Sequence, residues 1–397
     1  MSIWYIRIIC ALGSDSHYKP VFYSGEGKRT DASLHPAEQR GRRNMETGTL
    51  LNYGTGSIRL LIPEEALSRQ LTEYCSLMYP LHEETGAAAH WTFKIVGSEL
   101  LEKCIRNTDR SALLQLEHDM AGFKGQNRQE SWFLEAKRQW AVYINHKERQ
   151  VHAWVSQDDP FNFARKLIRQ IVSSEHQKAG AALIHASAVE YNGGAYVFAG
   201  DKGAGKTTVM MNLIAAGSAM YLGNDAVLLT PEARAVPVLA GPFVGLGTLG
   251  GIDKYRCLIP SKFAAALEAR ESSDYEASVQ KKISFALEEV ERLLSTTISK
   301  GANIKAIVFP TLIRKTESIE VEKISADTGA QLLQEQLMYD PNDHQNWLEI
   351  NPKPDVIALK QHVKRYTDHT PMFRMRFGRE SKDLINVFQR LVAEADI

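Results

Sequence analysis

Residues 200–208 read Gly200-Asp201-Lys202-Gly203-Ala204-Gly205-Lys206-Thr207-Thr208, and this stretch decides the fold of the 397-residue chain. An apolar run typical of a buried strand, Ala195–Ala199, precedes it, and a run typical of a buried helix, Val209–Ala216, comes after it. The spacing G-x-x-x-x-G-K-[ST] is the Walker A pattern of phosphate-binding loops. The alternative interpretation is a glycine-rich turn that only joins a strand to a helix.

The residue types of this stretch match what a bound phosphate requires. Glycines at 200, 203 and 205 allow positive φ and let backbone N–H groups approach phosphate oxygens, while the helix after them directs its positive dipole end at the same place. We expect Lys206 to contact the β- and γ-phosphates and the Thr207 hydroxyl to bind Mg²⁺. The predicted nucleotide-binding segment comprises Gly200, Asp201, Lys202, Gly203, Ala204, Gly205, Lys206, Thr207 and Thr208.

A loop of this kind also needs an acidic residue near the metal ion. Downstream, Gly217 is typical of a helix end, a short apolar run ending at Gly223 is typical of a strand, and Asn224-Asp225 comes directly after it. A second strand is predicted over Ala226–Leu229. Asp225 is therefore the candidate to hold Mg²⁺, directly or through water. An ordinary Asn-Asp turn is the alternative.

Upstream of the loop, the sequence predicts a hairpin. The strand-like runs Ala182–Tyr191 and Ala195–Ala199 are joined by Asn192-Gly193-Gly194, a strong tight-turn signal. With this hairpin, the pair His185-Ala186, the Walker A stretch and the acidic turn, the segment from His185 to Leu229 resembles the HPr kinase/phosphorylase family and the broader group of HPr-kinase-related proteins.

The resemblance implies a kinase that uses ATP and Mg²⁺ to phosphorylate a hydroxyl, often a serine of a protein or peptide. It implies a P-loop domain related to that of phosphoenolpyruvate carboxykinase, with Lys206 and Thr207 on phosphate and metal. It also implies that His185 lies beside the phosphate pocket and that Asp225 matches the second acid of the family's Asp-Asp pair. The first acid, which resembles the general base of the family, is Asn224 in this sequence, and an amide cannot take up the substrate proton at pH 7.

Three interpretations of Asn224 remain open. Phosphoryl transfer through a loose transition state needs little base catalysis. Alternatively, Asp201 or His185 takes the proton. In the third interpretation, the protein binds nucleotide but does not transfer a phosphoryl group to a hydroxyl. Arg256, which comes after the glycine-rich stretch Gly241–Gly247, is a candidate for neutralising the transferred phosphoryl group, and a solvated surface charge is an equal alternative.

Composition divides the chain into three parts. Residues 1–48 are polar and basic and are expected to be disordered, either as a basic arm for an anionic partner or as a leader. In residues 49–156 the sequence predicts one helix, from Pro63 to Met78, and short strand-like segments rich in aromatic and β-branched residues, namely Trp91–Val96, Trp132–Leu134, Trp140–Asn145 and Gln150–Val155. Together they predict a small α+β domain. Residues 157–397 are assigned to the HPr-kinase-like domain with C-terminal additions. The predicted fold class is α/β, an HPr-kinase/PEP-carboxykinase-like P-loop domain preceded by a small α+β domain.

Four further segments carry expectations. Asp159 and Pro160 predict the start of an amphipathic helix that packs on the next part of the chain. Apolar spacing predicts a helix over Ile283–Leu294 and a last helix over Ser381–Ala393, which docks either on the kinase core or on another subunit of a homo-oligomer. The polar segment Asp340–His344 is more typical of a loop than of a metal site.

Charge and cysteine content limit the functional classes. The 47 Lys and Arg residues balance 47 Asp and Glu residues, which argues against a protein that coats nucleic acid or anionic membrane. Cys10, Cys75, Cys104 and Cys257 are too far apart for a disulfide framework or a zinc motif, which favours a reducing compartment. No apolar run reaches the roughly 18–20 residues that span a bilayer.

We therefore expect a cytoplasmic ATP-dependent kinase. Its expected partner is a peptide, protein or small-molecule hydroxyl acceptor, with neither nucleic acid nor membrane. Two other functions stay open: a nucleotide-sensing module without catalysis, and nucleotidyl transfer with release of pyrophosphate.

Overall fold

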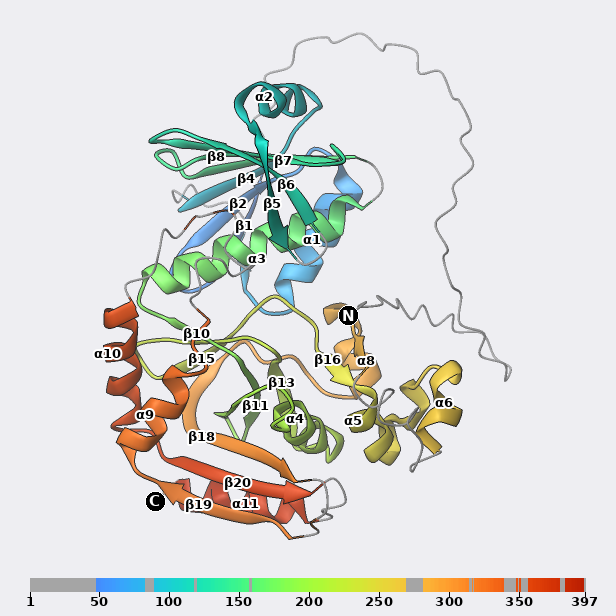
Figure 1. The fold of residues 1–397 in the computed structure, drawn as a ribbon, viewed down its shortest axis with the longest axis vertical. Helices are drawn as coiled ribbons and strands as arrows, with labels where there is room; N and C mark the ends of the chain where they lie inside the picture. The colour runs from blue at the N-terminus through green and yellow to red at the C-terminus, as the bar shows by residue number, and fades with distance from the viewer. Residues whose placement is uncertain are drawn as a thin grey trace.

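The computed structural model describes residues 48–82, 89–117, 120–156, 159–268, 281–313, 316, 318–338, 348, 350, 356–378 and 383–395. These residues form two lobes, each built on a nine-stranded sheet that combines parallel and antiparallel pairs (Figure 1). The fold is therefore α/β with mixed sheets. Within the described residues, no helix is both long and apolar enough to span a membrane. Residues 1–47 and the segment Asp340–His344 lie outside the described residues, so the expectations for them stay predictions.

The N-terminal lobe has the strand order β3-β1-β2-β4-β9-β8-β7-β6-β5. Its strands are β1 (Thr49–Asn52), β2 (Ser57–Leu61), β3 (Leu81–His82), β4 (Trp91–Ile95), β5 (Asp109–Glu117), β6 (Met120–Gln126), β7 (Glu130–Glu135), β8 (Trp140–Asn145) and β9 (Gln150–Val155). Helices α1 (Glu65–Ser76) and α3 (Pro160–Lys178) cover one face, and α2 (Glu99–Asn107) covers the other (Figure 1).

Alternation along β8 explains why both faces of this sheet are covered. Val142 and Ile144 are buried in the cluster below α1 and α3, whereas Ala141 and Tyr143 are buried against α2. Successive side chains of a strand point to opposite faces, so a run that is apolar at every position needs a partner on each side. The strands predicted at Trp140–Asn145 and Gln150–Val155 are confirmed.

Helix α3 begins as predicted and contacts both the next strand, β10 (Ala182–Ile184), and the N-terminal lobe. The Asp159 side chain accepts a hydrogen bond from the backbone N of Asn162 at 3.1 Å, and Pro160 occupies the first turn. Besides the expected contact with the next part of the chain, Phe163 stacks on Trp140 of the earlier strand β8, with ring centroids 4.9 Å apart. Much of its apolar face therefore belongs to the N-terminal lobe, and the assignment of residues 157–397 to one domain stays a prediction.

The C-terminal lobe contains the strand order β10-β14-β15-β18-β12-β11-β13, and β20 and β19 continue it beside β18. Its strands are β10 (Ala182–Ile184), β11 (Ala186–Tyr191), β12 (Gly194–Ala199), β13 (Ala219–Gly223), β14 (Val227–Leu229), β15 (Arg234–Pro237), β18 (Ala302–Ile313), β19 (Glu320–Ile324) and β20 (Met372–Gly378). The predicted hairpin is confirmed, because β11 and β12 pair through a turn in which Asn192 and Gly193 have φ of 50° and 75°. The single strand predicted over Ala182–Tyr191 is wrong, since it breaks at His185 and its two halves pair with different strands.

Four helices cover this second sheet. The helix after the Walker A stretch, α4 (Lys206–Ala215), lies with α11 (Leu384–Ala395) on one face, and α9 (Ala326–Gln334) and α10 (Val356–Thr367) lie on the other (Figure 1). Phe388 of α11 meets Tyr196 of β12 edge-on, with ring centroids 5.0 Å apart. The last helix, α11, therefore packs on the core of its own chain, which is the first of the two expectations for it.

A small unit lies beside α4. It contains the two-stranded sheet β16 (Phe243–Gly245) and β17 (Lys282–Ser284), helices α5 (Leu246–Gly251), α6 (Ser261–Glu268) and α8 (Val290–Leu294), and the 3₁₀ helices η1 (Asp253–Leu258) and η2 (Leu287–Glu289). The helix predicted over Ile283–Leu294 is wrong for its first half, because Ile283 pairs with Val244 across the β16–β17 ribbon. Long-range backbone pairing prevails over helical spacing here.

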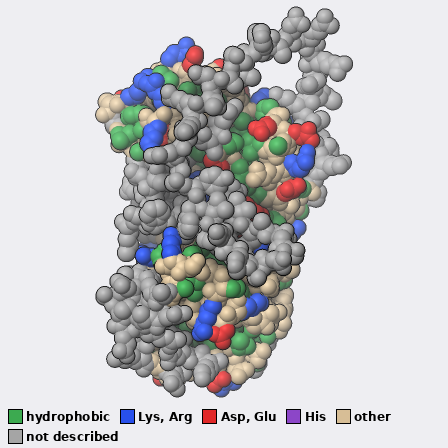
Figure 2. All heavy atoms as spheres, turned by 90° about the vertical axis from the view of Figure 1, so that its right-hand side faces the viewer, with side chains coloured by type: hydrophobic (Ala, Val, Ile, Leu, Met, Phe, Trp, Pro, Cys, Tyr) green, Lys and Arg blue, Asp and Glu red, His purple; other side chains and the backbone are tan. Residues whose placement is uncertain are grey.

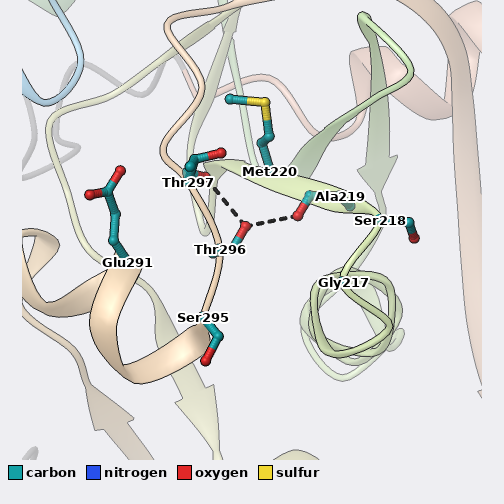
Figure 3. Close-up of a pocket in the computed structure, with 8 residues that line it drawn as sticks. All are labelled: Gly217, Ser218, Ala219, Met220, Glu291, Ser295, Thr296 and Thr297. Atoms are coloured by element: carbon teal, nitrogen blue, oxygen red, sulfur yellow. Dashed lines mark hydrogen bonds between the residues drawn. The ribbon is translucent and has the colours of Figure 1, made fainter.

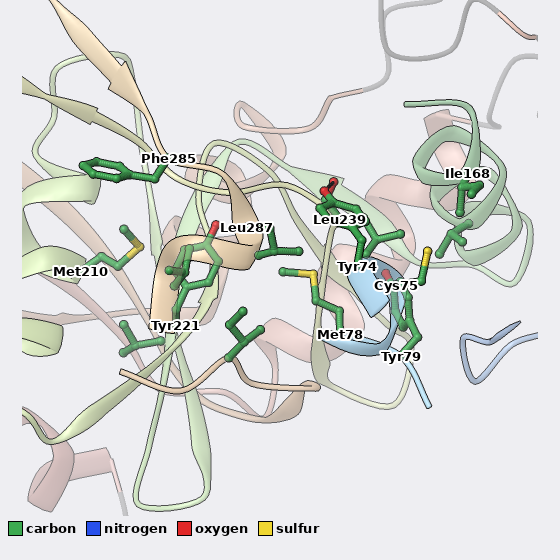
Figure 4. Close-up of a cluster of buried hydrophobic side chains, with 14 of the residues drawn as sticks. Tyr74, Cys75, Met78, Tyr79, Ile168, Met210, Tyr221, Leu239, Phe285 and Leu287 are labelled. Atoms are coloured by element: carbon green, nitrogen blue, oxygen red, sulfur yellow. Dashed lines mark hydrogen bonds between the residues drawn. The ribbon is translucent and has the colours of Figure 1, made fainter. Parts of the chain in front are cut away.

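One continuous core joins the two lobes (Figure 4). The last turn of α1 and the residues just after it contact the C-terminal lobe, where Tyr79 Oη donates to the carbonyl of Pro237 at 2.6 Å. Tyr74 Oη donates to the carbonyl of Leu239 at 3.2 Å. Both tyrosines are buried, and Figure 4 shows them in the same apolar cluster as Met78 and Leu239. The lobes are therefore held together by apolar packing and by hydrogen bonds to backbone.

The described surface carries both signs of charge. Figure 2 shows basic, acidic and apolar side chains close together on one face, in agreement with the balance of 47 basic against 47 acidic residues. Because the chain has no net charge, it does not attract an anionic ligand over a long distance. Binding of an anion therefore depends on individual cations placed close together. The arrangement around the start of α4 provides such cations.

Candidate functional site

The glycine loop, residues 200–205, connects the end of β12 to the start of α4. Gly203 and Gly205 have φ of 88° and 99°, a region that side chains disfavour. At Gly205, the residue directly before α4, an added Cβ would also lie 2.7 Å from the ring of Phe377 on β20. Glycine is thus required here both by backbone conformation and by close packing, and the first N–H groups of α4 are left facing the loop.

Lys206 folds back over this loop. Its ammonium donates to the carbonyls of Gly200 at 2.6 Å and Asp201 at 3.0 Å, and the residue is 6% exposed. Burial lowers the pKa of Lys206 to about 8, while the charge of Asp225 opposes the shift. The ammonium therefore stays largely protonated at pH 7 and lies where it can exchange carbonyl oxygens for phosphate oxygens.

Asn224 connects the start of α4 to its surroundings. Its Oδ1 accepts hydrogen bonds from Thr207 Oγ1 at 2.9 Å and from Ser187 Oγ at 2.8 Å, and its Nδ2 donates to the carbonyl of Phe243 at 3.2 Å. Because the Thr207 proton is directed at Asn224, the lone pairs of the threonine hydroxyl stay available to a metal ion. Asn224 is 5% exposed; its hydrogen bond with Ser187 is buried, and those with Thr207 and Phe243 are partly buried.

Asp225, the residue directly after Asn224, has a left-handed backbone conformation, with φ of 65°. Its carboxylate faces Lys282 of β17, with Nζ 3.4 Å from Oδ1 and 3.5 Å from Oδ2. The two predicted metal ligands come from neighbouring positions, because Thr207 of α4 donates to Asn224, the residue directly before Asp225. A hydroxyl and a carboxylate suit Mg²⁺, which usually takes one or two carboxylates and completes its shell with phosphate and water. The described residues contain no cluster of three or more His, Cys, Asp or Glu side chains arranged to hold a metal alone.

His185 and Asp201 are linked through Gln336. The backbone N of His185 donates to the carbonyl of Gln336 at 2.8 Å, and the Gln336 side chain donates to Asp201 Oδ1 at 3.1 Å. Burial lowers the pKa of His185, and the positive charge of Lys206 lowers it further. At neutral pH the imidazole is therefore uncharged and has a nitrogen able to accept a proton.

Of the remaining predicted residues, Thr208 and Lys202 lie at the glycine loop, whereas Arg256 lies on η1. Thr208 Oγ1 lies 2.9 Å from Thr248 Oγ1 of α5, and Lys202 is exposed at the tip of the loop. Arg256 lies on η1, where its guanidinium pairs with Asp253 at 3.1 Å and donates to the carbonyl of Gly250 at 3.0 Å. Arg256 is not among the charges that act on Lys206, whereas Lys282 is.

Four residues that contact the predicted site residues Asn224, Asp225 and Asp201 were not predicted from the sequence. They are Ser187, Phe243, Lys282 and Gln336. Ser187 carried one signal, since it lies two positions after His185 on the same strand-like run. The others come from separate elements, and only tertiary structure brings them to the loop.

A surface hollow of about 510 Å³ lies elsewhere on the same lobe (Figure 3). It is lined by Gly217, Ser218, Ala219, Met220, Glu291, Ser295, Thr296 and Thr297. Gly217 comes just after the C-terminal end of α4, so this hollow and the glycine loop are at opposite ends of the helix. In Figure 3 the Thr296 hydroxyl is directed at the carbonyl of Ala219, to which it donates at 2.8 Å.

Comparison with known proteins provides no assignment. No model of a known protein family matches the chain. A search of curated proteins also finds no match. The functional argument therefore depends on the geometry of the glycine loop and of the residues around it.

Proposed function

We propose that the protein is a Mg²⁺-dependent kinase that transfers the γ-phosphoryl group of ATP to a hydroxyl of a peptide, protein or small molecule. In this proposal the glycine loop is a P-loop of the HPr-kinase-like type. One observation carries the proposal: the loop ends at the start of α4, and the buried, charged Lys206 is folded over it. This combination of helix N-terminus and cation is suited to a polyphosphate.

Binding would use groups that are already in place. N–H groups at the start of α4 would donate to phosphate oxygens, and Lys206 would exchange the carbonyls of Gly200 and Asp201 for the β- and γ-phosphates. Mg²⁺, held by Thr207 and Asp225, would neutralise charge between these phosphates. Asn224 would orient the Thr207 hydroxyl by accepting its proton in a hydrogen bond.

Transfer would form a bond between the acceptor oxygen and the γ-phosphorus and break the bond from that phosphorus to the bridging oxygen, so that ADP leaves. The hydroxyl proton needs an acceptor, and the Asn224 amide is not one. Two groups are suited to this role: His185, which is uncharged at neutral pH, and the Asp201 carboxylate, which Gln336 holds. Because a loose transition state needs little base catalysis, replacing either group is expected to slow transfer without abolishing it.

A second function, nucleotide binding without transfer, is favoured by one observation. The Asn224 Oδ1 already accepts two hydroxyl protons, so this position offers no base to an acceptor. A nucleotide-sensing module would have the same loop and the same Lys206, but no productive acceptor position.

One experiment separates these functions. ATP labelled on the γ-phosphate would be incubated with the protein, Mg²⁺ and peptide or metabolite acceptors. Lys206→Ala tests the loop, and Lys300→Ala is the control, because Lys300 is an exposed lysine just before β18, at the end of β12 away from the loop. The kinase predicts a labelled acceptor and ADP, lost in Lys206→Ala and kept in Lys300→Ala. Binding without turnover identifies the module, and release of pyrophosphate identifies nucleotidyl transfer.

A further inference from the structure

Lys282 lies at the proposed nucleotide site, although no motif marks it. Its ammonium lies 3.4 Å and 3.5 Å from the two carboxylate oxygens of Asp225. Its positive charge also acts on Lys206 and on His185. Lys282 is therefore a second cation beside the one that the Walker A pattern supplies.

The position of Lys282 results from how the β16–β17 ribbon is attached. Asn224 donates to the carbonyl of Phe243 on β16, and Lys282 of β17 is opposite Gly245 in the same ribbon. The two consecutive residues Asn224 and Asp225 thus contact one strand each of this ribbon. This attachment keeps Lys282 next to the turn that the proposed function assigns to the metal ion.

The Asp225 carboxylate has two competing partners. Lys282 approaches both of its oxygens, and the proposed function places Mg²⁺ on the same group. The side chains of Lys282 and Asp225 remain 41% and 36% exposed, so the ion pair is screened by water and separates at little cost. An ammonium released from Asp225 would lie among the charges near Lys206, where the charge of a transferred phosphoryl group must be neutralised.

We propose that Lys282 is a second phosphate-binding cation, which occupies the Asp225 carboxylate in the free protein and contacts the γ-phosphate once it releases that carboxylate to Mg²⁺. This inference rests on the proposed function. It assigns to Lys282 the neutralising role that the sequence suggested for Arg256, whose own partners, Asp253 and Gly250, lie on η1 and α5. The inference adds no proton transfer.

The test uses Lys282→Met and Lys282→Arg in the full chain. Lys281→Met is the matched control, because Lys281 is the preceding residue and its ammonium lies over the Phe263 ring, 4.9 Å from the centroid. Binding of a non-hydrolysable ATP analogue would be titrated at increasing Mg²⁺ concentration by calorimetry, and transfer would be measured separately.

The expected changes for Lys282→Met run in opposite directions. Loss of the competing ammonium lowers the Mg²⁺ concentration at half-saturation by about two- to fivefold, the range of an exposed ion pair. Loss of the phosphate contact lowers transfer by about tenfold to a hundredfold. Lys282→Arg restores most of both properties, and Lys281→Met behaves as the unaltered protein.

Two results would overturn the inference. Equal Mg²⁺ dependence in Lys282→Met and Lys281→Met would show that Lys282 does not compete for Asp225. Normal transfer by Lys282→Met would show that its ammonium does not contact the phosphoryl group. The proposed function fails separately, if Lys206→Ala binds the nucleotide as tightly as the unaltered protein. If Lys206→Ala loses nucleotide binding while Lys282→Met behaves as the unaltered protein, only the proposed role of Lys282 is contradicted.

Discussion

Asn224 is the residue whose environment says most about the chemistry of the site. Its amide matches three neighbours by type: Oδ1 faces two hydroxyl donors, and Nδ2 faces a backbone carbonyl. A carboxylate would satisfy the two hydroxyls equally well but would turn its second oxygen towards the carbonyl of Phe243. The amide is therefore the better hydrogen-bonding partner at this position. A carboxylate would offer a general base but no structural advantage.

The first prediction concerns Asn224→Asp. We expect the free energy of unfolding to fall by about 1–3 kcal/mol at pH 8, because a buried carboxylate would face an acceptor. Protonation converts that oxygen into a donor, so the folded state favours the protonated carboxyl. The sign is then fixed: stability is retained at low pH and lost as the pH rises. Urea unfolding at pH 5 and pH 8 measures it, and equal losses at both values would contradict the prediction.

Asn224→Ala provides the control for this substitution. It removes the acceptor of Thr207 and Ser187 but introduces no titratable group, so its loss of stability should not depend on pH. In activity, we expect Asn224→Asp to change turnover more than nucleotide affinity, since the nucleotide contacts the loop and Lys206.

The second prediction concerns Lys206 and pH. Its pKa in the free protein is about 8, lowered by burial, and bound phosphate would raise it again. Nucleotide affinity is therefore full below about pH 8 and falls above it, by up to about tenfold per pH unit, because binding must then take up a proton. Calorimetry between pH 7 and pH 9.5 measures the slope. Lys206→Arg, whose guanidinium does not titrate in this range, should lose the dependence, and a persistent slope would implicate another group.

Among the elements, the junction between the glycine loop and α4 depends on a contact with β20. Gly205 lies against Phe377, while Gly203 has nothing within 4 Å of the position of an added Cβ, although both have positive φ. These two glycines separate the cost of backbone conformation from the cost of packing.

The third prediction uses this pair. Gly203→Ala is expected to cost about 1–2 kcal/mol of stability from the left-handed conformation alone. Gly205→Ala should cost more, because its Cβ would overlap the Phe377 ring. Adding Phe377→Leu to Gly205→Ala should recover part of the difference. Thermal unfolding of the four proteins checks this, and equal costs for the two single substitutions would disprove the proposed contact.

The sequence predicted those elements whose causes are local. The turn at Asn192-Gly193, the cap at Asp159 and the strand Trp140–Asn145 depend on residues within a few positions, and all three are confirmed. The break at His185 and the strand at Lys282 depend on Gln336 and Phe243, which are distant in the chain. The glycine loop was therefore found from the sequence, while the residues that surround it were not.

At the scale of the whole molecule, the two lobes share a core. The buried Tyr79, which follows α1 shortly after its end at Ser76, donates to a carbonyl of the other lobe at 2.6 Å. Lobes joined in this way are expected to unfold together, whereas lobes joined only by a linker would unfold in separate transitions.

The fourth prediction concerns this contact between the lobes. Tyr79→Phe leaves the Pro237 carbonyl buried without its donor, which is expected to cost about 1–3 kcal/mol. Calorimetry should show one transition moved to lower temperature. Tyr143→Phe is the control inside the N-terminal lobe, since Tyr143 donates to Glu130 within one sheet. It should move the same single transition, and a second, unmoved transition in either variant would show that the lobes are independent.

The central claim is that the backbone amides at the start of α4, together with Lys206, bind the polyphosphate of a nucleotide. Crystals soaked with Mg²⁺ and a non-hydrolysable ATP analogue test it most directly. The account predicts phosphate density within about 2.7–3.2 Å of the amides of residues 203–208 and of the Lys206 ammonium. Density for the analogue at another place, with the glycine loop empty and Lys206 still bound to the carbonyls of Gly200 and Asp201, would contradict it.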